Sequence, residues 1–554
     1  MTDGTAVPQE QQAKPGAWAP FGVRMFRWLW LAALCSNIGT WMHEVAAGWL
    51  MTDLSDSKLM VSLVQATTMG PVFLLGLFAG ALADIVDRRK LLAVAQLWNF
   101  LAAGALAAFT MADLITPGLL LTLVSLLAIG TALHLPAFQA IVPDLVPKSM
   151  LKPAVTLNGV SVNLARAVGP ALAGLIITSL GVWAAFAVNA VTFLAVLAVV
   201  IAWKPKPRFT RLPPEHLIRA VLVGLRYAKH DHPLRVVLMR VGIFVICASS
   251  AWALLPVVVR VELGRSSSDF GLALACIGIG AVSGAFLLPR LGKRFPADAL
   301  TVLATLVYAT GMVSLAVVKE FWVLLPCLVA LGLAWLTMMA TLNASAQTVL
   351  PDWVRARGLS VFLFVFSGAM AGGAAIWGVL ADLTTVGTSL CTAATVAVLG
   401  CLLAPWLPLR RGEFRDLSPT KQMPAHPTPD LDTEDTGEVQ VLVLYDIQPS
   451  NEPAFHDAMR EIRRWRLRTG ALSWSLYRDF DLPQRWVESF VVPSWHEHLR
   501  QHTRTTDEDW AAQARAFELH EGQAPPPIMH LIVPRPDGTI PINHENPEKT
   551  SPHT

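Results

Sequence analysis

Charged residues are scarce in this sequence. Lysine, arginine, aspartate and glutamate make up only 15% of the 554 residues, whereas hydrophobic residues make up 54%. Ordinary soluble domains carry about 25% charged residues, so this chain has too few to cover the surface of a water-soluble protein of its length. The composition therefore predicts a protein whose main solvent is the lipid bilayer.

Several informative patterns are also missing. All six cysteines lie in or beside apolar runs without CxxC or Cys/His spacing, so we expect neither a disulfide framework nor a metal site. The chain has no Gly-x-x-x-x-Gly-Lys-Ser/Thr loop, which argues against ATP as the direct energy source. The net charge of +3 gives no support for nucleic-acid binding. We expect no cofactor and no catalytic residues in the membrane part.

Long apolar runs are abundant. A spanning helix needs about 20 apolar residues, and six such runs lie on either side of a basic central stretch. We therefore predict an all-α polytopic membrane protein with twelve transmembrane helices in two six-helix pseudo-repeats, followed by a soluble domain. The predicted parts are a cytosolic tail (1–25), which is too polar for a cleaved signal peptide, helices one to six (26–203), a central loop with an amphipathic helix (204–233), helices seven to twelve (234–408), a flexible linker (409–436), the soluble domain (437–537) and a disordered tail (538–554).

The basic residues of the loops are distributed unequally. Most of them fall on the same side as the N-terminal tail, and the opposite side has only Lys58, Arg260, Arg265 and Lys319. Cytoplasmic loops of membrane proteins carry an excess of lysine and arginine. We therefore expect a multi-pass protein of the cell inner membrane with both termini in the cytosol.

Two segments occur in both halves. Gln139–Asp144 (QAIVPD) has a counterpart in Gln347–Asp352 (QTVLPD), at the ends of the fourth and tenth predicted helices. Gly80–Lys90 (GALADIVDRRK) has a weaker counterpart in Gly284–Arg294 (GAFLLPRLGKR), where Leu288 replaces Asp84. Repeats of this kind place a substrate site near the bilayer midplane, between the halves.

The soluble part follows a different pattern. We predict strands over residues 439–445, 472–477, 486–492 and 528–533, with helices over 451–468, 495–502 and 507–519. This order corresponds to a ferredoxin-like α+β domain. His496, His498 and His502 lie in the second of these helices, and no third metal ligand of suitable spacing follows. We therefore expect a solvated helix there rather than a metal site.

Three segments resemble known families. Gly80–Lys90 resembles the loop G-x-L-A-D-x-x-G-R-[RK]-x of the major facilitator superfamily, with Asp87 in place of the usual small residue. Pro136–Pro147 and Leu157–Gly174 resemble its transmembrane secretion effector, or enterobactin-exporter-like, branch. Ser494–His502 is similar to the dimeric α+β barrel of antibiotic-biosynthesis monooxygenases.

The resemblance implies a secondary transporter. It implies proton-driven efflux of a small amphipathic metabolite, siderophore or drug by alternating access, with homodimerisation or gating as the favoured role of the soluble domain. The expected partners are thus a small-molecule substrate, protons and the lipid bilayer. Two alternatives stay open, namely a proton-coupled uptake permease and a membrane-tethered enzyme or ligand sensor that acts through the soluble domain.

Glu44 is the only acid well inside a predicted span. A carboxylate within the membrane costs several kcal/mol unless it is paired or hydrated, so it marks a pathway or a proton site by default. Glu44 and the neighbouring His43 are our candidates for proton coupling. Adjacent residues of a helix point about 100° apart, so at most one of them faces a cavity squarely. The alternative is a place near the outer interface.

The resemblance assigns further residues. It implies a conformational switch at Gly80, Asp84, Asp87, Arg88 and Arg89, and an exporter-associated helix-five motif at Arg166, Gly169, Pro170 and Gly174. Arg166 could pair with an acid, bind an anionic group of the substrate or form a purely structural ion pair. Other polar and aromatic residues inside the runs could line a cavity or make hydrogen bonds between helices, namely Asn37, Trp41, Gln65, His134, Asn163, Trp252, Asn343 and Trp377.

Overall fold

The computed structural model describes residues 16–203, 217–409, 417–418, 420, 437–522 and 525–532. Side chains at positions 80, 81, 83–85, 140, 148 and 217–220 are outside the description. The predicted linker and the predicted disordered tail fall almost wholly outside the described residues. The described chain forms two compact units, one of residues 1–217, 239–343 and 362–408, and the other of residues 218–238, 344–361 and 409–554.

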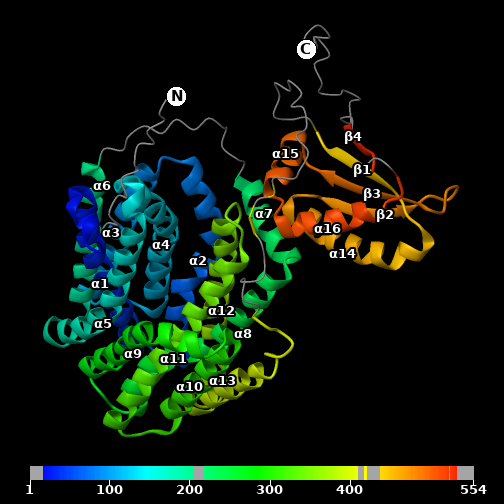
Figure 1. The fold of residues 1–554 in the computed structure, drawn as a ribbon. Coiled ribbons are helices and arrows are strands. Elements are labelled where there is room, and N and C mark those ends of the chain that lie inside the picture. Colours follow the sequence, from blue (N-terminus) through cyan, green and yellow to red (C-terminus); the bar gives the residue numbers. More distant parts are fainter. Residues whose placement is uncertain are drawn as a thin grey trace, which may run out of the picture. The chain divides into compact units, whose positions relative to one another are not determined.

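The first half of the membrane part consists of long helices joined by short turns (Figure 1). Asp87, Thr116 and Ser57 cap three of them by accepting backbone N–H groups of the first turn, which is the usual device for starting a helix. The helices are α1 (Arg24–Leu54), α2 (Lys58–Ile85), α3 (Arg88–Met111), α4 (Pro117–Leu145), α5 (Leu151–Leu180) and α6 (Val182–Ala202).

The second half repeats this plan. Ser266 begins α9 with a capping box, and the π-helical turn Val258–Glu262 extends α8. The helices are α8 (His232–Val257), α9 (Ser267–Arg294), α10 (Ala297–Val317), α11 (Phe321–Val349), α12 (Arg355–Leu383) and α13 (Val386–Cys401).

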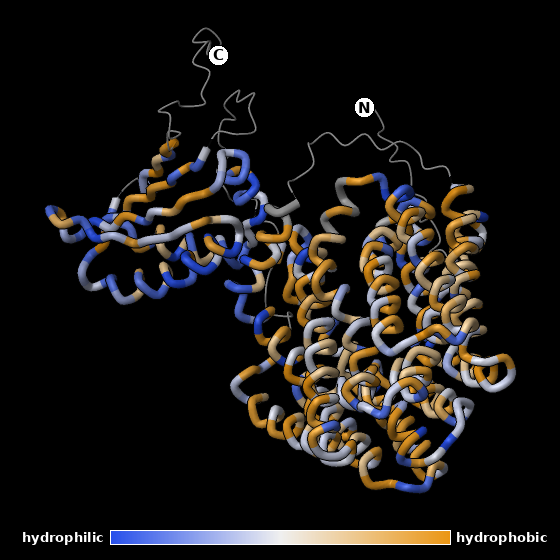
Figure 2. Tube along the Cα trace, turned by 180° about the vertical axis from the view of Figure 1, so that it is seen from behind, coloured by the Kyte–Doolittle hydropathy of each residue, from blue (hydrophilic) through white to orange (hydrophobic). Residues whose placement is uncertain are grey.

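Hydrophobic residues make up much of these helices, as the many orange segments of their traces in Figure 2 show. Within the described residues, ten helices are long and apolar enough to cross a membrane. Helix α13, with 16 residues, is one of the shorter apolar helices, and α1 is not among the ten. The chain is therefore a mostly helical, polytopic membrane protein.

The predicted helices seven to twelve extend to residue 408, but α13 ends at Cys401 and turns follow it. The side chain of Arg240 explains this difference, because it donates to the carbonyl groups of Ala404 and Leu407. An arginine that binds free carbonyls satisfies the end of a helix without further helical turns.

The soluble domain belongs to the second unit. Its elements are β1 (Val439–Asp446), α14 (Glu452–Thr469), β2 (Ser473–Arg478), β3 (Arg485–Val492), α15 (Trp495–Arg504), α16 (Asp507–Glu518) and β4 (Ile528–Ile532). All strand pairs are antiparallel in the order β2-β3-β1-β4, with the helices on one face of the sheet (Figure 1). Strand β1 alternates buried and half-buried residues, so Val441, Val443 and Tyr445 point into the core under the helices.

The predicted amphipathic helix is present as α7 (Leu217–His230). Part of its apolar face packs on protein within the second unit, because Tyr227 is buried and its hydroxyl donates to the carbonyl group of Val349 over 3.4 Å. Its ring also meets the ring of Trp353 with centroids 5.8 Å apart. Leu222 and Leu225 remain exposed. The helix therefore covers the ends of α11 and α12 as well as presenting an apolar surface.

Candidate functional site

A charged pair lies where α1 and α5 meet. Glu44 on α1 and Arg166 on α5 interact electrostatically. The guanidinium group of Arg166 also lies 5.5 Å from the ring centroid of Trp41, one helical turn before Glu44. Its Nε atom makes no hydrogen bond to any residue in the described part of the chain. Trp41 and Glu44 therefore share the face of α1 that meets α5, and Arg166 keeps a donor available.

His43 points elsewhere. It is 3% exposed, and its ring lies 5.1 Å from the ring of Phe186 on α6. Neither of its ring nitrogens has a hydrogen-bond partner among the described residues. The expected divergence of adjacent helical residues thus separates Glu44, which faces a charge, from His43, which packs inside the first half.

Aromatic rings continue this site into the second half. The rings of Trp41 and Trp252 lie 6.3 Å apart, and Trp252 meets Trp335 at 5.6 Å. Trp335 in turn contacts Phe244 and the rings of Tyr308 and Phe366. Such edge-to-face and tilted pairs are favourable contacts of about 0.5–1.5 kcal/mol each. Rings from both halves therefore gather beside the charged pair.

The helix-five motif brings the two halves together. A Cβ atom at Gly169 would lie 2.6 Å from the Cβ atom of Trp41, and one at Gly174 would lie 2.9 Å from the carbonyl oxygen of Ser267 on α9. On the α9 side, a Cβ atom at Gly271 would meet the carbonyl oxygen of Pro170 at 2.5 Å. Only glycine permits such close backbone contact between membrane helices. The motif therefore sets the distance of α5 from α1 and from α9.

Most of the other predicted cavity residues make contacts inside one half. The amide of Asn37 donates to Ser161, and that of Asn163 donates to the carbonyl group of Gly159 in its own helix. His134 pairs with Gln96 over 2.7 Å. The indole of buried Trp377 donates to the carbonyl group of Ile246 over 2.6 Å. Asn37, His134 and Trp377 thus bond between helices of one half, whereas Asn163 bonds within its own helix. Gln65 and Asn343 are half-buried on α2 and α11.

The predicted switch loop is held by several contacts. Asp87 accepts from the backbone N–H groups of Arg89 and Lys90 at the start of α3. Arg88 pairs with Asp144 at the end of α4, over 3.7 Å. Arg89 donates to the carbonyl groups of Val200 and Ile201 at the end of α6, where the helix dipole favours a cation. The loop thus joins α3, α4 and α6, whereas the side chain of Asp84 and the surroundings of Gly80 lie outside the description.

The opposite end of the bundle carries contacts between the halves. Arg260 pairs with Asp53 and lies 4.7 Å from the ring centroid of Trp49. Asp382 at the end of α12 accepts from the Ser57 hydroxyl over 2.6 Å and from the backbone N–H of Lys58 over 2.7 Å. The negative charge of Asp382 beside the N-terminus of α2 also complements the dipole of that helix. This end of α1 and α2 is therefore tied to α8 and α12.

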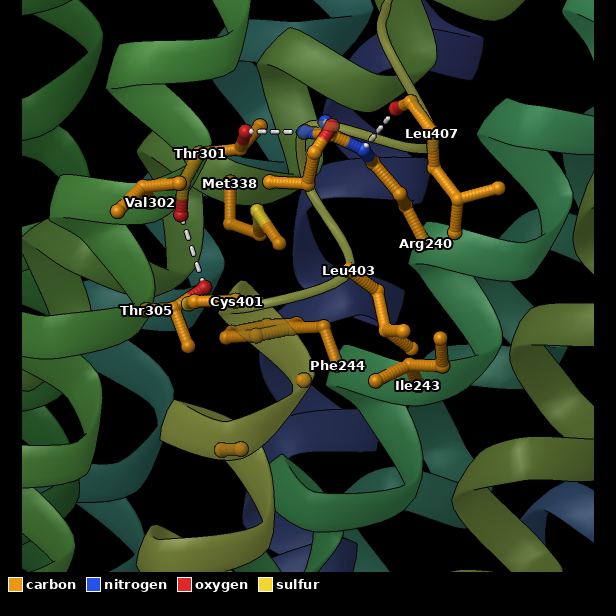
Figure 3. Close-up of a pocket in the computed structure, with 13 residues that line it drawn as sticks. Arg240, Ile243, Phe244, Thr301, Val302, Thr305, Met338, Cys401, Leu403 and Leu407 are labelled. Atoms are coloured by element: carbon orange, nitrogen blue, oxygen red, sulfur yellow. Dashed lines mark hydrogen bonds between the residues drawn. The ribbon is translucent and has the colours of Figure 1, made fainter.

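Sequence reasoning missed Arg240 on α8. This side chain is 8% exposed, and it donates to the Thr301 hydroxyl over 2.9 Å and to the carbonyl group of Leu407 (Figure 3). It also donates to Asp298 and to the carbonyl group of Ala404. A cavity beside it has an empty volume of about 400 Å³, counting space open to solvent, and is lined only by second-half helices and the turns after α13. Its place inside an apolar run is the signal that would have found it.

The prediction of a solvated helix over residues 495–502 of the soluble domain is wrong. On α15, His498 is 1% exposed and Gln501 is fully buried. The Nε2 atom of His498 lies 3.1 Å from that of His530 on β4, which is a pairing that sequence spacing did not reveal. Polar residues are buried here because Gln501 donates to the carbonyl group of Arg466 and so finds its partner within the domain.

Comparisons with known proteins agree with this architecture. Residues 15–537 match the model of the transmembrane secretion effector family, a major facilitator family. The staphyloferrin A transporter of Staphylococcus aureus (strain NCTC 8325 / PS 47) is 23% identical over 61% of this chain and 85% of its own length. The enterobactin exporter EntS of Escherichia coli O1:K1 / APEC is 28% identical over 68% of this chain and 90% of its own length.

Solved structures share the fold. A bacterial homologue of the human lysosomal transporter Spinster, in an inward-facing and unoccupied conformation, aligns with a TM-score of 0.54 at 16% identity, over 70% of this chain and 94% of that one. A point mutant of the nucleoside transporter NupG aligns with a TM-score of 0.58 at 11% identity, over 69% of this chain and 99% of that one. With these matches, the chain belongs to the transmembrane secretion effector family of major facilitator transporters.

Proposed function

We propose that this secondary transporter exports a small amphipathic metabolite of the siderophore type from the cytosol. The names of the relatives, a staphyloferrin A transporter and an enterobactin exporter, support this class of substrate. The observation that carries the proposal is the group of Glu44, Arg166, Trp41 and Trp252, which joins a charged pair to rings from both halves. Arg166 would bind anionic oxygens of the metabolite, and the indoles would bind its planar or apolar part.

We assign proton coupling to Glu44. A deprotonated Glu44 neutralises Arg166, whereas a protonated Glu44 leaves the guanidinium group free for an anionic substrate. Protonation of Glu44 and binding of an anionic substrate to Arg166 would thereby be linked at one site, which is a requirement for coupled transport. His43 is the weaker candidate, because it packs against Phe186 inside the first half.

The proposed topology has twelve spans in two six-helix pseudo-repeats, with α1 and α13 included, in the cell inner membrane and with both termini cytosolic. Basic loop residues support this orientation. The contacts of Asp53 with Arg260 and of Asp382 with the start of α2 then lie at the outer surface. Such contacts between halves are those of a state closed to the outside and reached from the cytosol.

We propose that the Gly80–Lys90 loop, with its Gly80 and Asp84, is the conformational switch of the first half. The contacts of Arg88 with Asp144 and of Arg89 with the end of α6 support this role, because they bind three inner helix ends together. Rearrangement of these contacts would accompany the rocking of one half against the other.

Transport assays test the assignment of Glu44. In proteoliposomes with an imposed pH gradient, the Glu44→Gln protein should insert normally and lose proton-driven transport of enterobactin or staphyloferrin A. His43→Gln is the matched control and should retain it. Full proton-driven efflux by Glu44→Gln would remove the carrier role. In inverted vesicles, an exporter accumulates the compound, whereas accumulation only in right-side-out vesicles would favour an uptake permease.

We also propose that the soluble domain is ferredoxin-like and mediates homodimerisation. The antiparallel strand order β2-β3-β1-β4 supports the first part. The face of the sheet away from the helices supports the second, because Met529 and Leu531 on β4 are 43% and 45% exposed beside Leu442 and Leu444 on β1. Light scattering on the full-length chain in detergent should report a dimer that Leu531→Asp weakens, and a wild-type monomer would contradict the idea.

A further inference from the structure

The soluble domain contains a pocket between the inner face of its sheet and the helices α15 and α16. Its empty volume is about 440 Å³, counting space open to solvent. Aromatic and aliphatic side chains form most of its wall, namely Val441, Val443, Phe490, Trp510, Phe517 and Ile528. A mostly apolar hollow with a few polar groups at one place is the usual form of a small-molecule site.

Histidines supply the polar part of this pocket. The ring of His498 lies 4.6 Å from that of His502 and 4.9 Å from that of His530, between ring centroids. Imidazole N–H groups donate to oxygen acceptors, so three neighbouring imidazoles suit a ligand that carries oxygen atoms. The described residues hold no cluster suited to a metal ion. The imidazoles and the apolar wall together suit an organic ligand with oxygen acceptors.

Arg466 makes the pocket floor rigid. Its guanidinium group donates to buried Glu488 and to Gln513, each over 3.0 Å, and lies 4.2 Å from the ring centroid of Phe490. Gln513 in turn donates to the hydroxyl of Tyr445 over 2.8 Å. This network satisfies the charge of Arg466 internally and fixes the orientation of Gln513 and Phe490 in the wall.

We propose that this pocket binds a small planar aromatic compound that carries a carboxylate or a phenolic hydroxyl group, and that its occupancy regulates transport. The ring of the ligand lies against Trp510 and Phe517, and its oxygens receive hydrogen bonds from His502 and His530. The site is independent of the proposed transport substrate and of the Glu44 and Arg166 pair.

Residues next to the pocket wall connect the pocket to the membrane helices, which supports the regulation of transport. Arg468, two positions after Arg466, binds Asp231 over 3.0 Å and also Asp509, which precedes Trp510. Asp231 directly precedes α8, a helix of the membrane part. Burial alone would lower the pKa of Arg468, but the carboxylates of Asp509 and Asp231 raise it above its ordinary value, so the anchor stays charged.

A second anchor follows His502. The guanidinium group of Arg504 lies 4.9 Å from the ring centroid of Trp353, in the turn between α11 and α12. Within the second unit, the wall segments at Arg466 and His502 thus continue within two residues into a contact with the end of a membrane helix. A ligand that shifts α15 or α16 acts directly on these ends.

Calorimetry on the full-length chain in detergent tests the site with salicylate as the probe. Wild type should bind salicylate saturably, and cyclohexanecarboxylate, which lacks a planar ring, should bind about tenfold more weakly or not at all. Trp510→Ala and His502→Ala should each weaken salicylate binding by about tenfold or more. His496→Ala is the matched control on the same helix, outside the wall, and should bind as wild type does.

Transport assays complete the test. Salicylate should change the transport rate of wild type in proteoliposomes and leave that of Trp510→Ala unchanged, while Trp510→Ala without salicylate still transports. Phe517→Leu serves as the second variant if Trp510→Ala unfolds. Absence of salicylate binding to wild type, or equal binding by wild type and the folded pocket variants, would overturn the site. Binding without any effect on transport would overturn the regulation, and neither result bears on Glu44.

Discussion

Arg166 in the first half of the membrane part and Arg240 in the second both lie inside apolar runs of their helices. The two guanidinium groups differ in how many hydrogen bonds they make. Arg240 donates to a carboxylate, a hydroxyl and two carbonyl groups, all within the second half. Arg166 faces Glu44 and the ring of Trp41, with its Nε atom unbonded among the described residues. Buried Arg240 donates from all three of its guanidinium nitrogens, whereas half-buried Arg166 keeps an unbonded donor that is available to a ligand. The comparison predicts a structural role for Arg240 and supports the proposed substrate-binding role of Arg166.

The largest expected effect on stability belongs to Arg240. Arg240→Ala removes the donors for Asp298 and for the carbonyl groups after α13, so it should lower the free energy of unfolding by about 3–5 kcal/mol. Thermal unfolding of the purified protein in detergent measures this. Arg240→Lys, which keeps the charge, should lose less. A Tm equal to that of wild type would show that the hydrogen bonds around Arg240 do not hold the second half together.

The largest expected effect on transport belongs to Arg166. Arg166 is half-buried, and a hydrogen bond from its charged group to an anionic substrate contributes about 1.5–3 kcal/mol, so Arg166→Ala should lower the transport rate by about tenfold or more. Rates in proteoliposomes measure this, with Arg166→Lys as the control that keeps the charge. The assigned roles of the two arginines would be contradicted if Arg166→Ala transported normally while Arg240→Ala folded normally and did not transport.

The smallest effect is expected at Trp41. Its ring contributes a cation–π contact with Arg166 of about 0.5–2 kcal/mol, so Trp41→Leu should weaken substrate binding by about two- to 30-fold. Trp41→Phe keeps a ring and should lie between Trp41→Leu and wild type. Binding assays with enterobactin on the detergent-solubilised protein check this order. Equal affinity of all three proteins would assign the ring to packing against Gly169 alone.

The inner ends of the halves differ as well. In the first half, the loop after α2 closes on its own helices through Arg88 with Asp144 and through Arg89 with the end of α6. In the second half, Asp352, the counterpart of Asp144, pairs with Arg355 of the following helix start. The sequence Gly284–Arg294 lacks the acid of the first copy. The sequence alone therefore predicted an unequal pair, and the structure gives the two copies different partners.

Glu44 shows how far the candidate site could be predicted. An acid within an apolar run carries its own signal, because it is costly there unless it has a partner. Its partner Arg166 lies on another helix, and sequence spacing carries no information on which helices meet. Asn37, His134 and Trp377 have the same type of signal, but their hydrogen bonds remain inside one half. Their difference from Glu44 depends on packing and could not be read from the chain.

His498 shows the same limit in the soluble domain. The strands and helices were predicted to within a few residues, because alternation and helical periodicity are local patterns. Burial of polar α15 was not predicted, since it depends on partners such as His530 and Arg466 that lie far along the chain. From sequence alone, a polar helix is predicted to be exposed to solvent, because the residues that would bury it are unknown.

The sequence by itself determined that this protein lives in a membrane, which segments form its helices and strands, and where its repeated loops lie, because hydropathy, periodicity and turn residues act over short distances. Only the tertiary structure decided that Glu44 faces Arg166 while His43 turns away, that Arg240 is fully bonded, and that three histidines share one pocket. Those outcomes depend on which faces of distant elements pack together, and no local property of a side chain specifies its neighbour.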